Sequence, residues 1–292
     1  MTASARELKI AFQGEAGANS HIACQEAYPK AEVVPYPTFE DALNAVATGK
    51  VDLGMIPIEN SVAGRVADIH HLMPEAGLHI VAESFLPIRN QLLGLRGVTL
   101  GEIKSVESHP MALGQCRNFL RKVGVKAVAA ADTAGAAREV AERQDRSCAA
   151  IASKLAAKIY GLDILAADIE DEAHSTTRFI VLSRDAKRPL PNNGPVLTTF
   201  VFQVRNIPAA LYKALGGFAT NSVNMTKLES YMLEGTFSAT QFYSDVEGHP
   251  DEPGLKLALE ELAFFSQPDS VKILGVYPAS PVRRTLSRNG RC

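Results

Sequence analysis

The stretch RDAKRPLPNNGP, residues 184–195, separates two parts of the chain that have different sequence patterns. It holds three prolines, two asparagines and a glycine, so neither a helix nor a central strand is expected to run through it. The length of 292 residues also suggests about two domains. We therefore predict a first domain over residues 8–184, a linker over 185–195 and a second domain over 196–278.

Ahead of the linker, short apolar runs alternate with stretches of helical periodicity. Runs such as 53–56 and 148–152 predict buried strands, and the stretches 38–48 and 110–123 predict helices between strands. Strands joined through helices of this length imply crossover connections and mostly parallel sheets. The first part of the chain is therefore predicted to be an α/β domain.

After the linker, the pattern changes to strand, helix, strand, strand, helix, strand. The predicted strands are 197–204, 223–231, 236–246 and 271–277, the predicted helices are 208–220 and 255–265, and a hairpin turn is expected at 233–235. This βαββαβ order predicts an antiparallel sheet with both helices on one face, the ferredoxin-like arrangement. The tail at 279–292, with its arginines and serines, is expected to be disordered.

The overall composition excludes several classes of function. Thirty basic and 32 acidic residues leave no basic patch for nucleic acid and no like-charged run for a membrane surface. The chain shows neither a secretory signal nor a run of about 18 apolar residues. Its four cysteines lie far apart, so we expect reduced thiols, no metal and no cofactor. These features favour a cytoplasmic protein that acts on a small polar molecule.

Two segments place polar groups directly after a predicted strand. Residues 12–20, FQGEAGANS, open a helix with two glycines, whose N–H groups could attract an anion, although a plain turn explains them as well. Residues 57–61, PIENS, place three consecutive polar side chains after a buried strand. Such groups need partners, either a polar ligand or the backbone of a capped turn.

Two further segments add polar groups to the same domain. In residues 107–116, ESHPMALGQC, Ser108 is expected to cap a helix, and Gln115 would lie about two turns further on the same face. In residues 174–179, HSTTRF, Arg178 precedes a buried strand and suits a carboxylate held by two hydrogen bonds. Its alternative partner is a neighbouring acidic side chain at 170–172.

Taken in order, the PIENS, SHP…QC and TRF segments resemble the signature segments of the prephenate dehydratase family, over nearly the whole chain. The resemblance implies a two-lobed domain like the type II periplasmic binding proteins, with lobe one at 8–86 and 170–184 and lobe two at 87–169. It implies that Thr177 and Arg178 are catalytic. The substrate-binding positions that it implies are Asn60, Ser61, Ser108, Gln115 and Phe179.

The second domain is similar to the ACT domains of these enzymes, which bind phenylalanine at a domain–domain interface. The resemblance places the effector site at Ala209, Ala210, Leu211, Asn224, Glu229 and Ser230. Tyr231 and Met232 stand where the family usually has arginine and proline. Pairing of such domains implies a homodimer or homotetramer.

The resemblance implies decarboxylating dehydration of prephenate in phenylalanine synthesis, with feedback by phenylalanine. Arg178 and the glycine turn at 12–20 would hold the two carboxylates of prephenate, and Thr177 would donate a hydrogen bond to the departing hydroxyl. Arogenate dehydration is an alternative that the sequence does not separate from this reaction. A non-catalytic amino-acid-sensing binding protein is a second alternative, of a different class.

Overall fold

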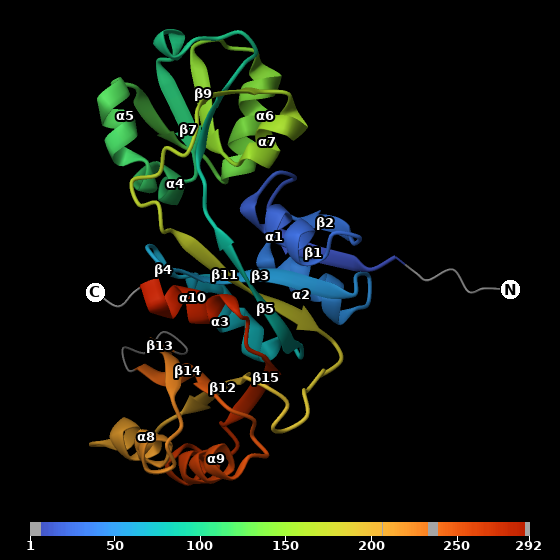
Figure 1. Ribbon diagram of the computed structural model, residues 1–292, viewed down its shortest axis with the longest axis vertical. Helices are drawn as coiled ribbons and strands as arrows, with labels where there is room; N and C mark the ends of the chain where they lie inside the picture. Colours follow the sequence, from blue (N-terminus) through green and yellow to red (C-terminus); the bar gives the residue numbers. More distant parts are fainter. Residues whose placement is uncertain (1–6, 206, 233–238, 290–292) are drawn as a thin grey trace, which may run out of the picture. The chain divides into compact units, whose positions relative to one another are not determined.

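The computed structural model describes residues 7–205, 207–232 and 239–289, and its internal contacts divide the chain into two units (Figure 1). Unit 1 contains Met1–Ile69 and Ser84–Phe179, and unit 2 contains His70–Glu83 and Ile180–Cys292. The chain passes between the units within strands β5 (His79–Pro87) and β11 (Thr176–Ser183). The predicted boundary at 185–195 therefore lies inside unit 2.

The first part of unit 1, lobe one, is built on a mostly parallel sheet. Its strands are β1 (Lys9–Gln13), β2 (Glu32–Tyr36), β3 (Leu53–Asn60), the short β4 (Gly64–Arg65) and the start of β11, with helices α1 (Asn19–Ala27), α2 (Phe39–Ala47) and α3 (Ala67–Leu72). Strand β1 pairs in parallel with β2 and β3, and its apolar centre is fully buried. Helix α2 begins where predicted, because the Thr38 side chain accepts a hydrogen bond from the Asp41 backbone.

Lobe two is a three-layer α/β unit. Its sheet has the order β10-β6-β9-β7-β8, formed by β6 (Gln91–Gly94), β7 (Ser105–Ser108), β8 (Lys126–Ala129), β9 (Cys148–Ala152) and β10 (Asp163–Ala166). Helices α4 (Pro110–Gln115) and α5 (Arg117–Val123) lie on one side, and α6 (Thr133–Arg143) and α7 (Lys154–Tyr160) lie on the other (Figure 1). A 3₁₀ turn, η2 (Leu100–Glu102), follows β6.

The chain enters and leaves lobe two at neighbouring positions. The Ile169 amide donates to the Asn90 carbonyl at 2.9 Å, and the Asn90 amide donates to the Glu170 carboxylate at 2.9 Å. Lobe two is therefore an insertion between β5 and β11.

Three details of unit 1 differ from the sequence prediction. The helix predicted over 110–123 is two helices that break at Cys116, and its N-cap is His109, not Ser108. Ser108 ends β7 instead, because it pairs with Ala129 of the neighbouring parallel strand. Strand β3 continues through PIEN to Asn60, beyond the predicted end at residue 56, because Glu59 and Asn60 pair with β4.

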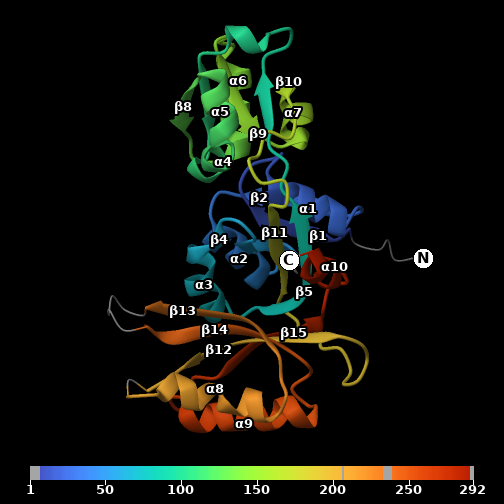
Figure 2. The ribbon, with the colours of Figure 1, turned by 60° about the vertical axis from the view of Figure 1, so that its left-hand side comes forward.

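Unit 2 confirms the predicted βαββαβ order. Its sheet contains β12 (Val196–Gln203), β13 (Met225–Met232), β14 (Ala239–Glu247) and β15 (Lys272–Pro278), in the order β13-β14-β12-β15 with every neighbouring pair antiparallel. Helices α8 (Ala210–Thr220) and α9 (Pro253–Phe265) cover one face (Figures 1 and 2). Phenylalanines fill the space beneath them, and Phe200 and Phe218 stack with ring centroids 5.8 Å apart. The predicted α/β fold class, with a ferredoxin-like second domain, is confirmed.

Contacts with residues 70–83 explain why unit 2 extends beyond the predicted second domain. This segment ends α3, forms the 3₁₀ turn η1 (Met73–Glu75) and begins β5. The His70 ring lies 5.0 Å from the Tyr243 ring, and the His71 ring lies 5.1 Å from the Tyr231 ring. The face of the sheet opposite α8 and α9 is thereby covered by residues that precede lobe two in the sequence.

The tail was expected to be disordered, but it contains a helix, α10 (Val282–Asn289). Arg283 binds both oxygens of the fully buried Glu83 carboxylate, at 2.7 and 2.8 Å. A buried carboxylate needs such a partner, so this ion pair fixes the start of the helix. The predicted hairpin at 233–235 lies outside the described residues. Among the described residues, none of the helices has the length and apolar character needed to cross a membrane.

Candidate active site

Asn60, the last residue of β3, is the centre of a hydrogen-bond network in lobe one. Its Oδ1 accepts from the backbone amides of Val62 and Ala63, at 2.9 and 2.8 Å. These two donors fix which end of the amide carries the oxygen. Its Nδ2 therefore donates to Thr177 Oγ1 at 3.0 Å and to Ser175 Oγ at 3.1 Å. The PIENS and TRF segments thus meet through side chains 117 positions apart.

Ser61 joins the same two segments through the backbone. Its amide donates to the Thr176 carbonyl at 2.9 Å, and its Oγ accepts from the Thr176 amide at 3.0 Å. The Ser61 hydroxyl also donates to the His174 carbonyl at 3.3 Å. Ser61 therefore holds the start of β11 against the end of β3, with its hydroxyl already engaged.

Arg178 lies on the opposite face of β11 from Thr177, as strand alternation predicts. Its side chain is 3% exposed, and Nη1 lies 2.8 Å from the Glu59 carboxylate. We had expected a substrate carboxylate or an acidic residue at 170–172 as its partner. The structure pairs it with Glu59 of PIENS, because β3 and β11 are neighbours in the sheet.

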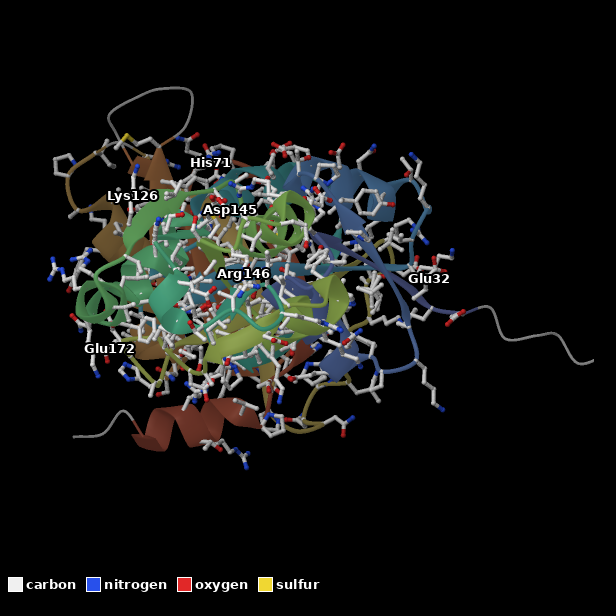
Figure 3. All side chains as sticks on the ribbon, turned by 90° about the horizontal axis from the view of Figure 1, so that it is seen from above. Glu32, His71, Lys126, Asp145, Arg146 and Glu172 are labelled. Atoms are coloured by element: carbon white, nitrogen blue, oxygen red, sulfur yellow. The ribbon has the colours of Figure 1, made fainter. Side chains whose placement is uncertain are left out.

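A cavity of about 520 Å³ lies beside this network within unit 1. It is lined by Val62, Ala63, Pro110, Met111, Gly114, Gln115, Arg117, Asn118, Arg121, Glu170, Asp171, Glu172 and Ser175. Gln115 is thus brought to the same cavity as Ser175, which is the direct neighbour of Asn60 and Thr177. Glu172, labelled in Figure 3, contributes an exposed carboxylate.

The cavity contains both signs of charge. Glu170 is paired with Arg89 at 2.8 Å, and Asp171 accepts from the Asn118 amide at the start of α5. Arg117 and Arg121, one helical turn apart on α5, place two guanidinium groups at the cavity. A small anion with polar substituents fits this mixture of fixed carboxylates, amides and arginines.

Of the predicted site residues, Gln115 alone lines this cavity. Asn60, Ser61, Thr177 and Arg178 belong to the network beside it, and two predicted substrate-binding residues, Ser108 and Phe179, belong to neither. Ser108 is fully buried and donates to the Ile151 carbonyl at 2.7 Å, so its hydroxyl joins β7 to β9 within lobe two. Phe179 is 1% exposed and lies among the apolar core residues. Both side chains support the fold around the site.

The glycine turn at 12–20 also differs from the expected anion cradle. The Gly14 amide donates to the Tyr36 carbonyl, the Gly17 amide to His21 Nδ1 and the Ala18 amide to the Glu15 carbonyl. Burial lowers the pKa of His21, which keeps the ring neutral and able to accept. Three of the turn's amides are therefore already used inside the protein.

A cysteine nucleophile does not fit this site. Burial, with Asp171 and Glu170 nearby, raises the pKa of the Cys116 thiol to about 12. The reactive form of a cysteine is the thiolate, which such a thiol does not form near neutral pH. The polar groups of the site therefore act by hydrogen bonds and charge.

The predicted effector residues of unit 2 lie at the start of α8 and along β13. Ala209 is the N-cap of α8 with a left-handed backbone (φ 62°), Ala210 is buried and Leu211 is half-buried. The Asn224 carbonyl accepts from Glu247, Glu229 lies 3.4 Å from Lys227, and Ser230 pairs with Phe242 on β14.

Tyr231, at the position where the ACT domains that this unit resembles usually have arginine, lies on the sheet face covered by residues 70–83. Its hydroxyl accepts from Gln241 at 2.7 Å, and burial raises its pKa to about 12. Met232, by contrast, is exposed. The side chain at position 231 thus serves packing within unit 2.

Ser175 and Glu59 are members of the site that the sequence reasoning missed. Ser175 stands two residues before Thr177, and residues two apart in an extended strand share a face. That spacing could have identified Ser175. Glu59 belongs to the PIENS segment, but only the pairing of β3 and β11 gives it a role.

Comparison with known proteins gives a consistent result. Residues 10–187 match the family model described as prephenate dehydratase. A bifunctional N-acyl-homoserine lactone acylase/prephenate dehydratase of Komagataeibacter europaeus is 52% identical over 278 residues, covering 94% of this chain and 97% of that protein. Arogenate dehydratase/prephenate dehydratase 1 of Arabidopsis thaliana is 39% identical, covering 95% of this chain and 74% of that protein.

Two solved structures agree with these relatives. A prephenate dehydratase from Arthrobacter aurescens in complex with L-Phe has 30% identity and a TM-score of 0.83, covering 93% of this chain and 90% of that one. A structure described as GqqA, a novel type of quorum quenching acylase, has 52% identity and a TM-score of 0.87, covering 94% of this chain and 100% of that one.

Proposed function

Because the chain belongs to the prephenate dehydratase family, we propose that it converts prephenate into phenylpyruvate. In this reaction the prephenate dianion takes up one proton and releases carbon dioxide and water, leaving the phenylpyruvate anion. Loss of the ring carboxylate and the 4-hydroxyl makes the ring aromatic, so the overall reaction is strongly downhill. The protein has to bind a dianion, orient it and assist the departing hydroxyl.

The observation that carries this proposal is the hydrogen bond that Thr177 Oγ1 accepts from Asn60. Asn60 donates to Thr177 Oγ1, so one lone pair of that oxygen is occupied and the hydroxyl proton is available to a bound substrate. A threonine hydroxyl is too weak an acid to be fully deprotonated near neutral pH. Thr177 would therefore stabilise the departing hydroxyl by a hydrogen bond, which is stronger in a site that excludes water.

We assign the substrate carboxylates to Arg117 and Arg121, in place of Arg178 and the glycine turn. Both arginines line the cavity that contains Ser175 and Gln115. Arg178 would act through Glu59, keeping β3 and β11 in register beneath Asn60 and Thr177. Gln115 would supply a neutral hydrogen bond to the substrate.

A pair of substitutions at Thr177 tests the proposal. Thr177→Val keeps the shape but removes the hydroxyl, and we expect kcat to fall by about 10²–10³. Thr177→Ser retains the hydroxyl and should retain most of the activity. The assay follows the absorbance of the phenylpyruvate enolate after prephenate is added. A folded Thr177→Val protein with wild-type turnover would refute the role of the hydroxyl, and an inactive wild-type protein would refute the reaction itself.

Arogenate is the nearest alternative substrate, and the Arabidopsis relative is named for both reactions. Arogenate carries an ammonium group on its side chain, which the carboxylates of Glu172 and Asp171 at the cavity could attract. Side-by-side measurement of kcat/KM on the two substrates decides between them. A value at least tenfold higher for arogenate would change the assignment.

A second candidate activity is hydrolysis of the amide bond of N-acyl-homoserine lactones. It is favoured by one observation: the Komagataeibacter relative, named for both activities, is covered over 97% of its length. That relative therefore has little sequence outside the part shared with this chain. Release of homoserine lactone and free fatty acid from an acylated lactone, compared with a heat-denatured control, tests this activity.

Regulation by phenylalanine would act through unit 2. The Arthrobacter structure, 30% identical, holds L-Phe, and pairing of two second domains would make the protein a homodimer or homotetramer. A ligand changes activity only through different affinities for two states of the protein. We expect phenylalanine to inhibit, with tyrosine as the control amino acid. A flat response to phenylalanine would refute this regulation and leave the dehydratase proposal intact.

A further inference from the structure

The glycine turn of lobe one is bound by three side chains of lobe two, all within unit 1. Tyr160 at the end of α7 donates its hydroxyl to the Ala16 carbonyl at 2.8 Å. Ser153, the N-cap of α7, donates to the Gly17 carbonyl at 2.5 Å. Arg138 of α6 donates from Nε and Nη2 to the two oxygens of Glu15, at 2.7 and 3.0 Å.

The packing beneath these hydrogen bonds is close. A Cβ atom placed on Gly17 would lie 2.8 Å from the Ala156 Cα, and the backbone at Gly17 has φ +94°. Only glycine satisfies both conditions without strain. Ser153 is 4% exposed and uses its hydroxyl twice, because it also accepts from the Ala156 amide. Backbone and side chains of lobe two are thus fitted to this turn.

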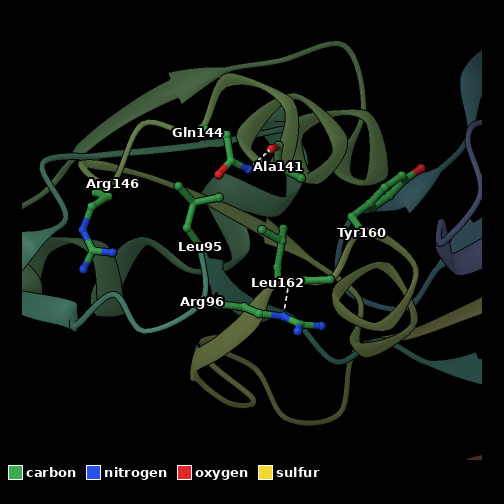
Figure 4. A pocket seen from close by; sticks show the side chains of 8 residues that line it. Leu95, Arg96, Ala141, Gln144, Arg146, Tyr160 and Leu162 are labelled. Carbon is green, nitrogen blue, oxygen red and sulfur yellow. Dashed lines mark hydrogen bonds between the residues drawn. The ribbon is translucent and has the colours of Figure 1, made fainter.

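The turn also borders a cavity that both lobes line. Gln13, Glu15 and Tyr36 from lobe one and Asp132 and Tyr160 from lobe two contribute to a volume of about 500 Å³. In Figure 4 the hydroxyl end of Tyr160 points away from the other labelled side chains of lobe two, in agreement with its bond to Ala16. The contacts therefore lie at the edge of an opening between the lobes.

We propose that residues 15–17 and their partners Arg138, Ser153 and Tyr160 form a clasp that holds the lobes closed. Arg138 is a positioning residue in this clasp, since it contacts Glu15 and not the candidate active site. Its contribution differs from that of the hinge segments, because Glu15 and Arg138 are 123 positions apart and lie on different lobes. Loss of the clasp would favour an open arrangement in which Gln115 is separated from Asn60 and Thr177.

The kinetic consequence rests on the proposed dehydratase function. A substrate that binds only the closed form has an apparent dissociation constant equal to the intrinsic one divided by the closed fraction. Once substrate has closed the lobes, the chemical step is unchanged. Weakening the clasp should therefore raise KM and leave kcat nearly constant.

The test compares Arg138→Met with the matched control Arg146→Met. Arg146, labelled in Figure 3, pairs with Glu102 at 2.9 Å, but both residues belong to lobe two. Each substitution removes one arginine. Arg138→Met also removes an exposed pair with Glu142 in the same helix, but the Arg138–Glu15 pair joins the lobes and the Arg146–Glu102 pair does not. We expect Arg138→Met to raise KM by about three- to fivefold with kcat unchanged, and Arg146→Met to change neither.

A second measurement does not depend on the reaction. Hydrogen–deuterium exchange of the peptide covering residues 14–20, without substrate, should be faster in Arg138→Met and unchanged in Arg146→Met. Glu15→Gln should match Arg138→Met, and the double variant should be no worse than either single variant. Unchanged exchange or additive effects on exchange would overturn the clasp. If exchange is faster in Arg138→Met but the wild-type protein has no dehydratase activity, the clasp is retained and the proposed reaction is refuted.

Discussion

Asn60→Asp would reverse the hydrogen bonds of the candidate active site while keeping its shape. The retained Oδ1 would continue to accept from the Val62 and Ala63 amides. The second atom would change from an NH₂ donor into an oxygen without a proton. Thr177 and Ser175, which now accept from Asn60, would have to donate to the new oxygen. The Thr177 proton would then be unavailable to the substrate.

The expected magnitudes separate catalysis from folding. Withdrawing one preorganised donor from a departing oxygen costs about 10²–10³ in kcat. Asn60→Ala, by contrast, removes the acceptor for two loop amides, each worth about 0.5–1.5 kcal/mol, and should lower the free energy of unfolding by about 1–3 kcal/mol. Asn60→Asp keeps both loop bonds, so its free energy of unfolding should stay within about 1 kcal/mol of wild type.

Turnover of prephenate and urea denaturation of the same preparations provide the two measurements. The introduced carboxylate also repels a dianion and should raise KM, so kcat at saturating substrate is the decisive value. An Asn60→Asp enzyme with kcat within about threefold of wild type would refute the assignment of the Thr177 proton. Equal loss of stability in the Asp and Ala variants would refute the role given to the two loop bonds.

Three further predictions concern stability. Glu59→Gln removes the carboxylate that lies 2.8 Å from the 3%-exposed Arg178 and should lower the free energy of unfolding by about 3 kcal/mol in urea denaturation; a loss under about 1 kcal/mol, typical of a surface ion pair, would contradict this. Gly17→Ala should destabilise more than Gly64→Ala, because both have positive φ but only Gly17 faces another helix; equal melting temperatures would contradict this. Burial lowers the pKa of His21 below its ordinary value of 6.5, so the unfolded chain binds the proton more readily and the free energy of unfolding should fall as the pH drops below 6.5. His21→Gln should weaken this pH dependence, and an unchanged slope of the free energy of unfolding against pH would contradict the prediction.

The sequence was informative where the deciding pattern is local. Periodicity predicted the βαββαβ order and the buried strand that follows Arg178. The resemblance to the prephenate dehydratase family, carried by the PIENS and TRF segments, placed Asn60 and Thr177 in one site. The periodic features depend on neighbours within a few residues.

The sequence was uninformative where a distant partner decides. Ser108 can end a strand or cap a helix with similar local geometry, and its hydrogen bond to the Ile151 carbonyl, 43 positions away, settles the outcome. Arg178 had acidic neighbours in sequence, but its partner Glu59 is 119 positions away. The helix break at Cys116 coincides with the Asp171 amide bonding the Gln115 carbonyl at 2.6 Å, which no helix pattern reveals.

The insertion of lobe two also determines the order in which the parts of unit 1 are synthesised. Asn60 is translated 115 residues before Ser175, and at about 5–20 residues per second the ribosome needs roughly 6–23 s to cover that distance. During this interval β3 emerges without β11 beside it, while lobe two, with a core of its own, can already fold. The nascent chain should therefore complete the inserted lobe first, and the Asn60–Thr177 hydrogen bond should be among the last features of unit 1 to form.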